Sequence, residues 1–288
     1  KYQYYAKFDW PRIITPKLSF PVNEKVVEAV KKTEAEAVAQ IKKAFKDNPR
    51  DIAAIIIEPV QCEGGDNHFR KEFLQQLRAL ADENEALLIF DEVQTGIGIT
   101  GQMWCHQHFE VKPDLMAFGK KSQICGVLAG PRLDEIKDNV FTESSRINST
   151  WGGSLVDMVR FQKFLEIIEK DKLVENSRKQ GAYFLAELQK LQKEFPEAVS
   201  NVRGLGLLIA FDLPTTEERS EFLKICLDNG LIILSCGHYS IRVRPALDIG
   251  RAEIDEAMSI FRKSLLTLLE RRSQRQKKVA TDEAKYEI

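Results

Sequence analysis

Several features that define whole classes of proteins are absent from this sequence of 288 residues. No apolar stretch approaches the roughly 20 residues that a membrane-spanning helix needs. The 42 basic and 43 acidic residues leave a net charge of -1, so no overall field attracts nucleic acid or an anionic membrane. We therefore expect neither nucleic acid nor membrane as a partner.

Cysteine is also scarce, with five residues that are scattered along the chain. They form no Cys-x-x-Cys pair, and the four histidines show no metal-binding motif, so we expect no disulfide framework and no metal site. The P-loop, the Rossmann fingerprint and the Gly-x-Ser-x-Gly elbow are missing as well. Reduced cysteines suit a reducing compartment, and we expect a cytoplasmic protein.

The two ends of the chain have unusual compositions. The first residue is Lys1, and the aromatic start Lys1–Tyr5 does not have the pattern of a signal peptide. We interpret this as a chain that begins partway through a longer protein. Residues 271–288 are dense in charge and poor in large apolar side chains, which predicts a disordered tail.

The first half of the chain alternates amphipathic helices with short, continuously apolar runs. Such runs are typical of parallel strands that are buried on both faces, and the alternation indicates an α/β domain with a mostly parallel sheet. The expected strands are Ile52–Ile57, Ala86–Phe90, Leu115–Phe118 and Gly126–Gly130, and the expected helices are Asn23–Asp47 and Lys71–Asn84.

After Trp151 the strict alternation is lost, which indicates a smaller α+β domain. We therefore divide the chain into residues 1–155, residues 156–270 and the tail. The expected helices are Leu155–Glu169, Leu173–Lys193, Glu217–Asn229 and Ala252–Leu269, and the expected strands are Gly206–Phe211, Leu231–Leu234 and Ile241–Arg244.

Three ionisable side chains, Glu58, Asp91 and Lys120, follow the predicted parallel strands. In such sheets ligands bind beyond the carboxyl ends of the strands. A carboxylate such as Asp91 can pair with a cationic ring nitrogen or simply cap a turn. A lysine such as Lys120 can form a Schiff base, although a solvated Lys-Lys pair is the common alternative.

Two further patterns are ambiguous by themselves. Arg242 and Arg244 alternate along a predicted strand and so share one face, which suits either carboxylate recognition or surface ion pairs. The glycines of Glu63-Gly64-Gly65 allow close approach to a ligand, but a plain turn explains them equally well.

Taken together, four segments resemble the signature of the class III (ω-amino) aminotransferases of fold type I, which use pyridoxal 5'-phosphate (PLP). Within that family they look most like the L-lysine 6-aminotransferases, with the 4-aminobutyrate aminotransferases as close kin. The resemblance implies a large PLP-binding domain, here incomplete, and a small C-terminal domain. The segments are Ile56–Gly65, Leu87–Gly96, Pro113–Lys120 and Asn148–Gly153.

The resemblance also implies roles for individual residues. Asp91 and Lys120 would be catalytic, with Asp91 on the PLP ring nitrogen and Lys120 as the Schiff-base lysine. Gln94 would bind the phenolic oxygen of PLP, and Ser149 and Thr150 would bind the phosphate in the neighbouring subunit of a homodimer with a shared active site. The residues expected to bind substrate are Glu63, which would act as a movable gate, Asn148 and Arg242, which would hold a carboxylate.

The implied reaction moves the ε-amino group of L-lysine to 2-oxoglutarate. A 4-aminobutyrate or ornithine aminotransferase, or a catalytically silent dimerisation partner, is the alternative. The spacing to Cys125-Gly126 would select Lys121 as the Schiff-base lysine, whereas Gly119 selects Lys120, which we prefer. The N-terminal part of the family is absent from this sequence, so we expect little or no transaminase activity from the chain alone.

Overall fold

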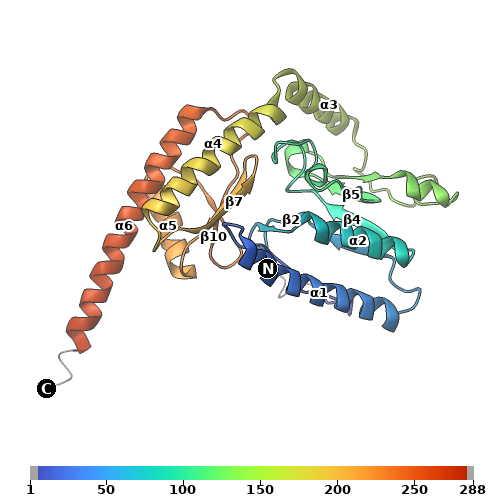
Figure 1. The fold of residues 1–288 in the computed structure, drawn as a ribbon. Coiled ribbons are helices and arrows are strands. Elements are labelled where there is room, and N and C mark those ends of the chain that lie inside the picture. The colour runs from blue at the N-terminus through green and yellow to red at the C-terminus, as the bar shows by residue number, and fades with distance from the viewer. Residues whose placement is uncertain (1–5, 284–288) are drawn as a thin grey trace.

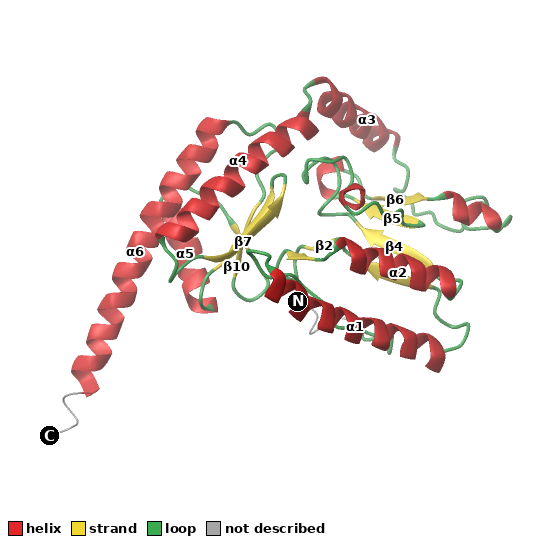
Figure 2. Cartoon of the chain, in the orientation of Figure 1, coloured by secondary structure: helices red, strands yellow, loops and turns green. Residues whose placement is uncertain are grey.

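The computed structural model describes the backbone of residues 6–283 and the side chains of residues 6–277. Two four-stranded sheets organise the chain, one in each half (Figure 1). The first has the strand order β1-β4-β5-β6 and the second the order β7-β8-β10-β9. Helices flank both sheets, and loops at their facing edges bring the two halves together (Figure 2).

The first sheet is parallel apart from its last strand. Strands β1 (Ala54–Ile57), β4 (Leu87–Asp91) and β5 (Leu115–Phe118) run in the same direction, and β6 (Gly126–Ala129) returns antiparallel to β5. Ile57 lies beside Phe90 and Asp91 beside Ala117, so the carboxyl ends of the three parallel strands meet at one edge. This confirms the predicted α/β organisation and its mostly parallel sheet.

Helices α1 (Glu24–Asp47) and α2 (Lys71–Glu83) share a buried cluster with this sheet. The side chain of Asn23 caps α1 by accepting from the Val26 amide at 3.0 Å, which satisfies a donor that the helix leaves open. The buried faces repeat at helical spacing, as the sequence predicts. They consist of Ala37, Val38 and Ile41 in α1 and of Phe73, Leu74, Leu77 and Leu80 in α2.

One expectation for this sheet is wrong. We expected the run that contains β1 to be buried on both faces, but Ile56 is 68% exposed. The reason is that the face of the sheet that carries Ile56 and its paired neighbour Ile89 is only partly covered by the described residues. The apolar side chains of β1 are therefore only partly packed against other described residues.

The second sheet is antiparallel and consists of β7 (Ser200–Leu205), β8 (Leu208–Asp212), β10 (Ser240–Val243) and β9 (Leu234–Cys236). Helices α4 (Leu173–Glu194), α5 (Thr216–Asp228) and α6 (Arg251–Glu283) pack against it, and α3 (Leu155–Lys170) precedes them. Their core contains three mutually tilted or edge-on phenylalanine rings, which are Phe211, Phe222 and Phe261. The predicted α+β character of this half is confirmed.

Several short elements differ from the prediction. Strand β9 begins at Leu234 instead of ending there, and β8 begins at Leu208 because Gly206, with φ +54°, lies in the turn before it. Strand β7 and the small hairpin β2 (Val60–Gln61) and β3 (Asn67–His68) were not expected. Three short 3-10 turns complete the fold, and they are η1 (Cys105–His108), η2 (Lys120–Ser122) and η3 (Pro131–Glu135).

The expected disordered tail is instead helical as far as the structure describes it. Helix α6 continues to Glu283, and its last turns extend beyond the other elements (Figure 1). Arg272 forms a two-pronged ion pair with Glu218 of α5, and Arg271 and Arg275 both pair with Glu221. These pairs attach a charged segment that has few apolar side chains. Residues 284–288 lie outside the described residues.

Between residues 6 and 283, no helix combines the length and the apolar character that crossing a membrane requires.

Candidate active site

A cavity of about 730 Å³ lies where the two halves meet. Its walls combine residues from the loops after β4 and β5 with residues from β9 and β10 and the loop after β10. Four of the side chains that line it are cationic, namely Lys120, Lys121, Arg242 and Arg244. A cavity with this lining is suited to a ligand that carries negative charge.

The predicted cluster at the strand ends is present. Burial raises the pKa of the Glu58 carboxyl, and the negative charge of Asp91 acts in the same direction. The Cys62 amide, which donates to Glu58 Oε2 at 3.0 Å, and the positive charge of Lys120 oppose this shift. Asp91 and Lys120 therefore both lie near Glu58, as the parallel alignment of β1, β4 and β5 requires.

Asp91 caps the turn that follows β4. Its Oδ1 accepts from the Val93 amide at 3.0 Å, which is the ordinary structural role that the sequence left open. The cap fixes the orientation of the carboxyl group at the end of the strand. Capping and pairing with a cation are compatible, because a carboxylate has two oxygens and several lone pairs.

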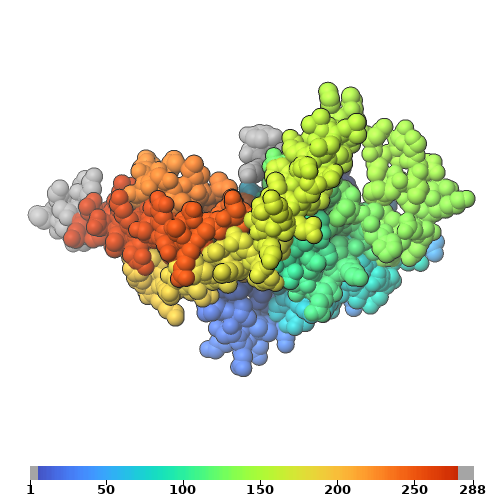
Figure 3. All heavy atoms as spheres, turned by 90° about the horizontal axis from the view of Figure 1, so that it is seen from above, coloured from blue at the N-terminus to red at the C-terminus, as the bar shows by residue number. Residues whose placement is uncertain are grey.

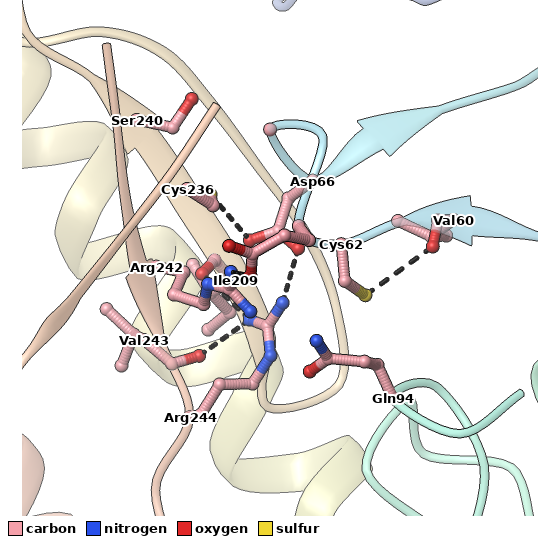
Figure 4. A network of polar contacts seen from close by, with 12 residues as sticks. Val60, Cys62, Asp66, Gln94, Ile209, Cys236, Ser240, Arg242, Val243 and Arg244 are labelled. Atoms are coloured by element: carbon pink, nitrogen blue, oxygen red, sulfur yellow. Dashed lines mark hydrogen bonds and ion pairs between the residues drawn. The ribbon is translucent and has the colours of Figure 1, made fainter. Parts of the chain in front are cut away.

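Gln94 links the two halves of the cavity. With its amide oxygen turned toward the cations, it accepts from Lys120 Nζ at 3.2 Å and from Arg242 Nη1 at 3.3 Å. This orientation follows from the hydrogen-bond network, because the alternative would place the amide NH₂ against two donors. Figure 4 shows Gln94 next to Arg244.

The neighbouring lysines have different environments. Lys120 is exposed to the cavity, and its φ of +57° places it in the left-handed region, which is uncommon for a side chain of this kind. Lys121 is more buried and donates to the backbone carbonyl of Gln94 at 2.8 Å. Burial lowers the pKa of the Lys121 ammonium to about 8, and the positive charge of Arg244 adds to this effect.

Arg242 and Glu63 form an ion pair across the cavity. The Arg242 side chain is 6% exposed, whereas that of Glu63 is 39% exposed. The Nε atom of Arg242 is buried and has no hydrogen-bond partner in the described part of the chain. Two of the three residues that the family resemblance implies for substrate binding, Glu63 and Arg242, are thus in direct contact, although they are far apart in the chain.

The segment with Asn148, Ser149 and Thr150 lies elsewhere. All three residues are exposed, and none lines the cavity. The light-green part of the chain before and around this segment protrudes at one end of the molecule (Figure 3). The structure therefore does not bring these residues together with Lys120 and Arg242 in one chain, and their predicted roles require a second subunit.

Residues that sequence analysis did not single out also contribute to this region. Asp66 and Arg203 are almost completely buried where the two halves meet. Arg203 lies on β7, which the sequence did not indicate, and so nothing marked its side chain as buried. An Asp that directly follows Gly-Gly is common in turns and gives no stronger signal.

Among the described residues, no group of three or more His, Cys, Asp or Glu side chains is arranged to hold a metal ion. The donors of the cavity suit PLP better. A lysine and a glutamine converge from adjacent loops, a carboxylate stands at the end of a neighbouring strand, and unpaired guanidinium Nε atoms lie on Arg242 and Arg244. A phosphorylated aldehyde with a basic ring nitrogen can use the lysine, the glutamine and the carboxylate, and the two arginines favour an anionic ligand beside it.

A lysine at the carboxyl edge of a mostly parallel sheet, facing a small antiparallel domain, is the arrangement of fold type I PLP-dependent enzymes. Residues 3–265 match the family model described as Aminotransferase class-III, and the chain belongs to this family. The solved structure of lysine aminotransferase from M. tuberculosis in the internal aldimine form superposes with a TM-score of 0.89 at 48% identity. The match covers 92% of this chain and 60% of that one.

Curated relatives include the L-lysine-epsilon aminotransferase of Mycobacterium tuberculosis, which is 49% identical over 261 residues. The 4-aminobutyrate aminotransferase of Kluyveromyces lactis is 36% identical over 267 residues. The two alignments each cover 91% of this chain, but only 58% and 55% of the relatives. The chain thus spans somewhat more than half the length of the relatives it matches.

The lowered pKa of Lys121 predicts a pH-dependent stability. Between about pH 8 and the usual lysine value of about 10.4, the unfolded chain binds a proton that the folded chain has lost, so stability rises with pH in this window. Relative to Lys121→Met, the wild-type free energy of unfolding should therefore gain about 1–2 kcal/mol between roughly pH 7.5 and 9.5. Denaturant unfolding of both proteins at the two pH values measures this difference.

Replacement of the exposed Lys112 by Met is the matched control, since it removes a lysine without removing a buried charge. The Lys112→Met protein should follow the wild type at both pH values. Parallel pH dependence of the wild type and Lys121→Met would contradict the placement of Lys121 in a desolvated site.

Proposed function

We propose that this chain is part of a PLP-dependent aminotransferase that transfers the ε-amino group of L-lysine to 2-oxoglutarate, giving 2-aminoadipate 6-semialdehyde and glutamate. The observation that carries the proposal is a single cavity that holds a lysine for the cofactor and an arginine–glutamate pair for the substrate. The 49% identity to an L-lysine-epsilon aminotransferase favours lysine as the donor. The reduced state of the scattered cysteines suits a cytoplasmic enzyme.

PLP, when bound, supplies an electron sink for the carbon that carries the transferred amine. In this chain Lys120 would hold the cofactor and then move the proton at that carbon. Asp91 would keep the ring nitrogen protonated, and Gln94 would donate to the phenolic oxygen. Support for Lys120 over Lys121 comes from their contacts, since Lys121 Nζ already donates to the Gln94 carbonyl whereas Lys120 Nζ faces the Gln94 side chain.

The pair of Glu63 and Arg242 offers a way to accept two dissimilar substrates at one site. A buried guanidinium without a partner costs about 3–5 kcal/mol, so Arg242 needs an anion at every stage. When the bound substrate presents no carboxylate at this position, Glu63 serves as that anion. When 2-oxoglutarate arrives, its carboxylate replaces Glu63, whose partly exposed side chain has room to move away.

We also propose that the enzyme is a homodimer with a shared active site. Large apolar side chains are exposed next to the segment with Ser149 and Thr150, where Trp151 is 84% exposed and Leu155 is 82% exposed. Contiguous exposed apolar surface of this kind marks an interaction site. A second copy that covers it would bring Ser149 and Thr150 to the partner's cofactor phosphate, and Asn148 to the substrate.

Two alternatives remain as second candidates. A 4-aminobutyrate or ornithine aminotransferase would use the same cavity with a different donor. The identity to a 4-aminobutyrate aminotransferase is 36%, which is lower than the 49% to an L-lysine-epsilon aminotransferase and so favours lysine over 4-aminobutyrate. A silent dimerisation partner would keep the apolar surface but not bind PLP.

Half-reaction rates with lysine, ornithine and 4-aminobutyrate separate the enzymes. Robust turnover by the 288-residue chain alone would contradict our expectation that it has little activity.

Borohydride reduction in the presence of PLP identifies the lysine that holds the cofactor. The pyridoxyl group should become attached to Lys120, because its amine is exposed to the cavity. Peptide mass spectrometry locates the label. Lys120→Ala should abolish the labelling, whereas Lys121→Ala should retain it. Label on Lys121 would reassign the Schiff-base lysine, and no label on either would favour the silent partner.

Removal of the Glu63 carboxylate should change the balance between the two half-reactions. In Glu63→Gln the shape of the side chain is kept, but Arg242 loses its anion when lysine is bound, so the lysine half-reaction should slow by about tenfold or more relative to the 2-oxoglutarate half-reaction. Single-turnover spectroscopy measures the ratio of the lysine rate to the 2-oxoglutarate rate, and it requires a preparation of the protein that is active in both half-reactions. An unchanged ratio would argue against the gate.

A further inference from the structure

The turn that carries Glu63 is fastened to the second sheet from its back. The turn spans Glu63–Asp66 and connects β2 to β3. Arg203 of β7 donates from Nε to the carbonyl of Asp66 at 2.9 Å and from Nη2 to the carbonyl of Gly65. Nη2 also donates to Ser240 Oγ at 2.8 Å. One buried guanidinium thus holds two successive carbonyls of the turn against the sheet.

The carboxylate of Asp66 provides a second attachment. It forms an ion pair with Arg244 at the end of β10, and Cys236 Sγ lies 3.5 Å from Asp66 Oδ2 (Figure 4). The Asp66 side chain is 1% exposed, and that of Arg244 is 13% exposed. Removal of one partner from an ion pair this well buried destabilises the protein strongly, because the other charge is left desolvated and unpaired.

The backbone itself is in close contact at the same place. The Gly237 amide donates to the Glu63 carbonyl at 3.0 Å. A Cβ atom at Gly237 would lie 2.9 Å from Gly65 Cα and 3.0 Å from the Gly64 carbonyl oxygen, and Gly237 has a φ of +53°. The loop between β9 and β10 can approach the turn this closely only with glycine at position 237.

The charge of Arg203 is balanced independently of the turn. Its Nη1 contacts Asp212 Oδ1 at 3.0 Å on the neighbouring strand β8. Arg203 is therefore neutralised within its own sheet and contributes directed hydrogen bonds, rather than net charge, to the turn. Glu63 contrasts with these neighbours, since its backbone is held by Gly237 while its side chain stays 39% exposed.

We propose that Arg203, Asp66 and Arg244 act as positioning residues for Glu63. We call these three residues the turn anchor. The turn anchor holds the backbone of Glu63 at a fixed distance from Arg242, so that only the Glu63 side chain moves when a substrate carboxylate competes for the guanidinium. The strength of that competition, and with it the preference for dicarboxylates, is set in part by Arg203 and Asp66, which do not line the cavity. This inference rests on the proposed function of Glu63 and Arg242.

Hydrogen exchange tests the turn anchor without relying on any activity. Arg203→Lys keeps the positive charge next to Asp212, but a single ammonium cannot donate to both turn carbonyls and Ser240 in the same geometry. The Gly237 amide should exchange about 10-fold faster or more in Arg203→Lys, while amides of α2 stay unchanged. Arg272→Lys is the control, because it alters an equally two-pronged arginine that links α6 to Glu218 of α5 and has no contact with the turn.

Asp66→Asn is the second variant in case Arg203→Lys does not fold. It is nearly identical in shape, retains the backbone carbonyls that accept from Arg203, and removes the ion pair with Arg244 together with the carboxylate that Cys236 Sγ contacts. Faster exchange of the Gly237 amide is again expected. Exchange of that amide at the wild-type rate in a folded variant of either kind would overturn the turn anchor.

A double-mutant cycle tests whether the turn anchor acts through Glu63. The probe is glutarate, a dicarboxylate without a reactive carbonyl, and calorimetry measures its Kd. Arg203→Lys should strengthen glutarate binding by about 3- to 10-fold, because a loosened turn lets Glu63 compete less effectively for Arg242. In a Glu63→Gln background the same substitution should have no effect. An equal change in both backgrounds, or none in either, would overturn the inference.

The Arg242→Gln variant distinguishes a failure of the turn anchor from a failure of the proposed carboxylate site. Glutarate binding that persists in Arg242→Gln would show that the proposed carboxylate site is wrong, whatever the exchange data say. Loss of glutarate binding in Arg242→Gln, together with faster Gly237 exchange and a Glu63-dependent change of Kd in Arg203→Lys, supports both proposals.

Discussion

The balance of charge in one cavity is the constraint on which the rest of this structure depends. Four cationic side chains converge there, and two of them, Arg242 and Arg244, are largely buried. Buried guanidinium groups require anionic partners, because desolvation without compensation costs several kcal/mol. Glu63 and Asp66 fill this need from a single short turn, and so the first half of the chain neutralises arginines that belong to the second half.

The two acidic residues of that turn differ in burial, and this difference distinguishes the roles that we propose for them. Asp66 is enclosed with its partner, whereas Glu63 is partly exposed, and in our proposal this exposure lets Glu63 give up its place to a ligand. In this arrangement the pair of Asp66 and Arg244 would keep the shape of the site. Exchange at the pair of Glu63 and Arg242 would change its charge. The proposed function would need such a change, because lysine and 2-oxoglutarate would present different groups to the same arginine.

Much of the first half could be predicted from sequence. The apolar runs before Asp91 and Lys120 are continuous, the helices between them have a clear apolar face, and parallel strands place their carboxyl ends together. Local patterns were less informative where hydrogen bonds between distant segments decide the structure. Strand β7 contains Arg203 and Gly204 and has little strand character, yet it pairs with β8, with a register shift between Ser200 and Arg203. Helix α6 extends past residue 270 because arginines on it meet glutamates on α5, which no local pattern reveals.

By itself the sequence determined the α/β class, the order of the main elements and the identity of the residues at the strand ends, because periodicity and strand polarity are local properties. Only the tertiary structure decided which of those residues meet. It joined Glu63 to Arg242 and Asp66 to Arg244 across nearly the whole chain, gave Lys120 and Lys121 different surroundings, and left Ser149 and Thr150 on the surface. Contacts of this kind depend on how two sheets pack against each other, and that packing is set by the sum of many distant side chains rather than by any one motif.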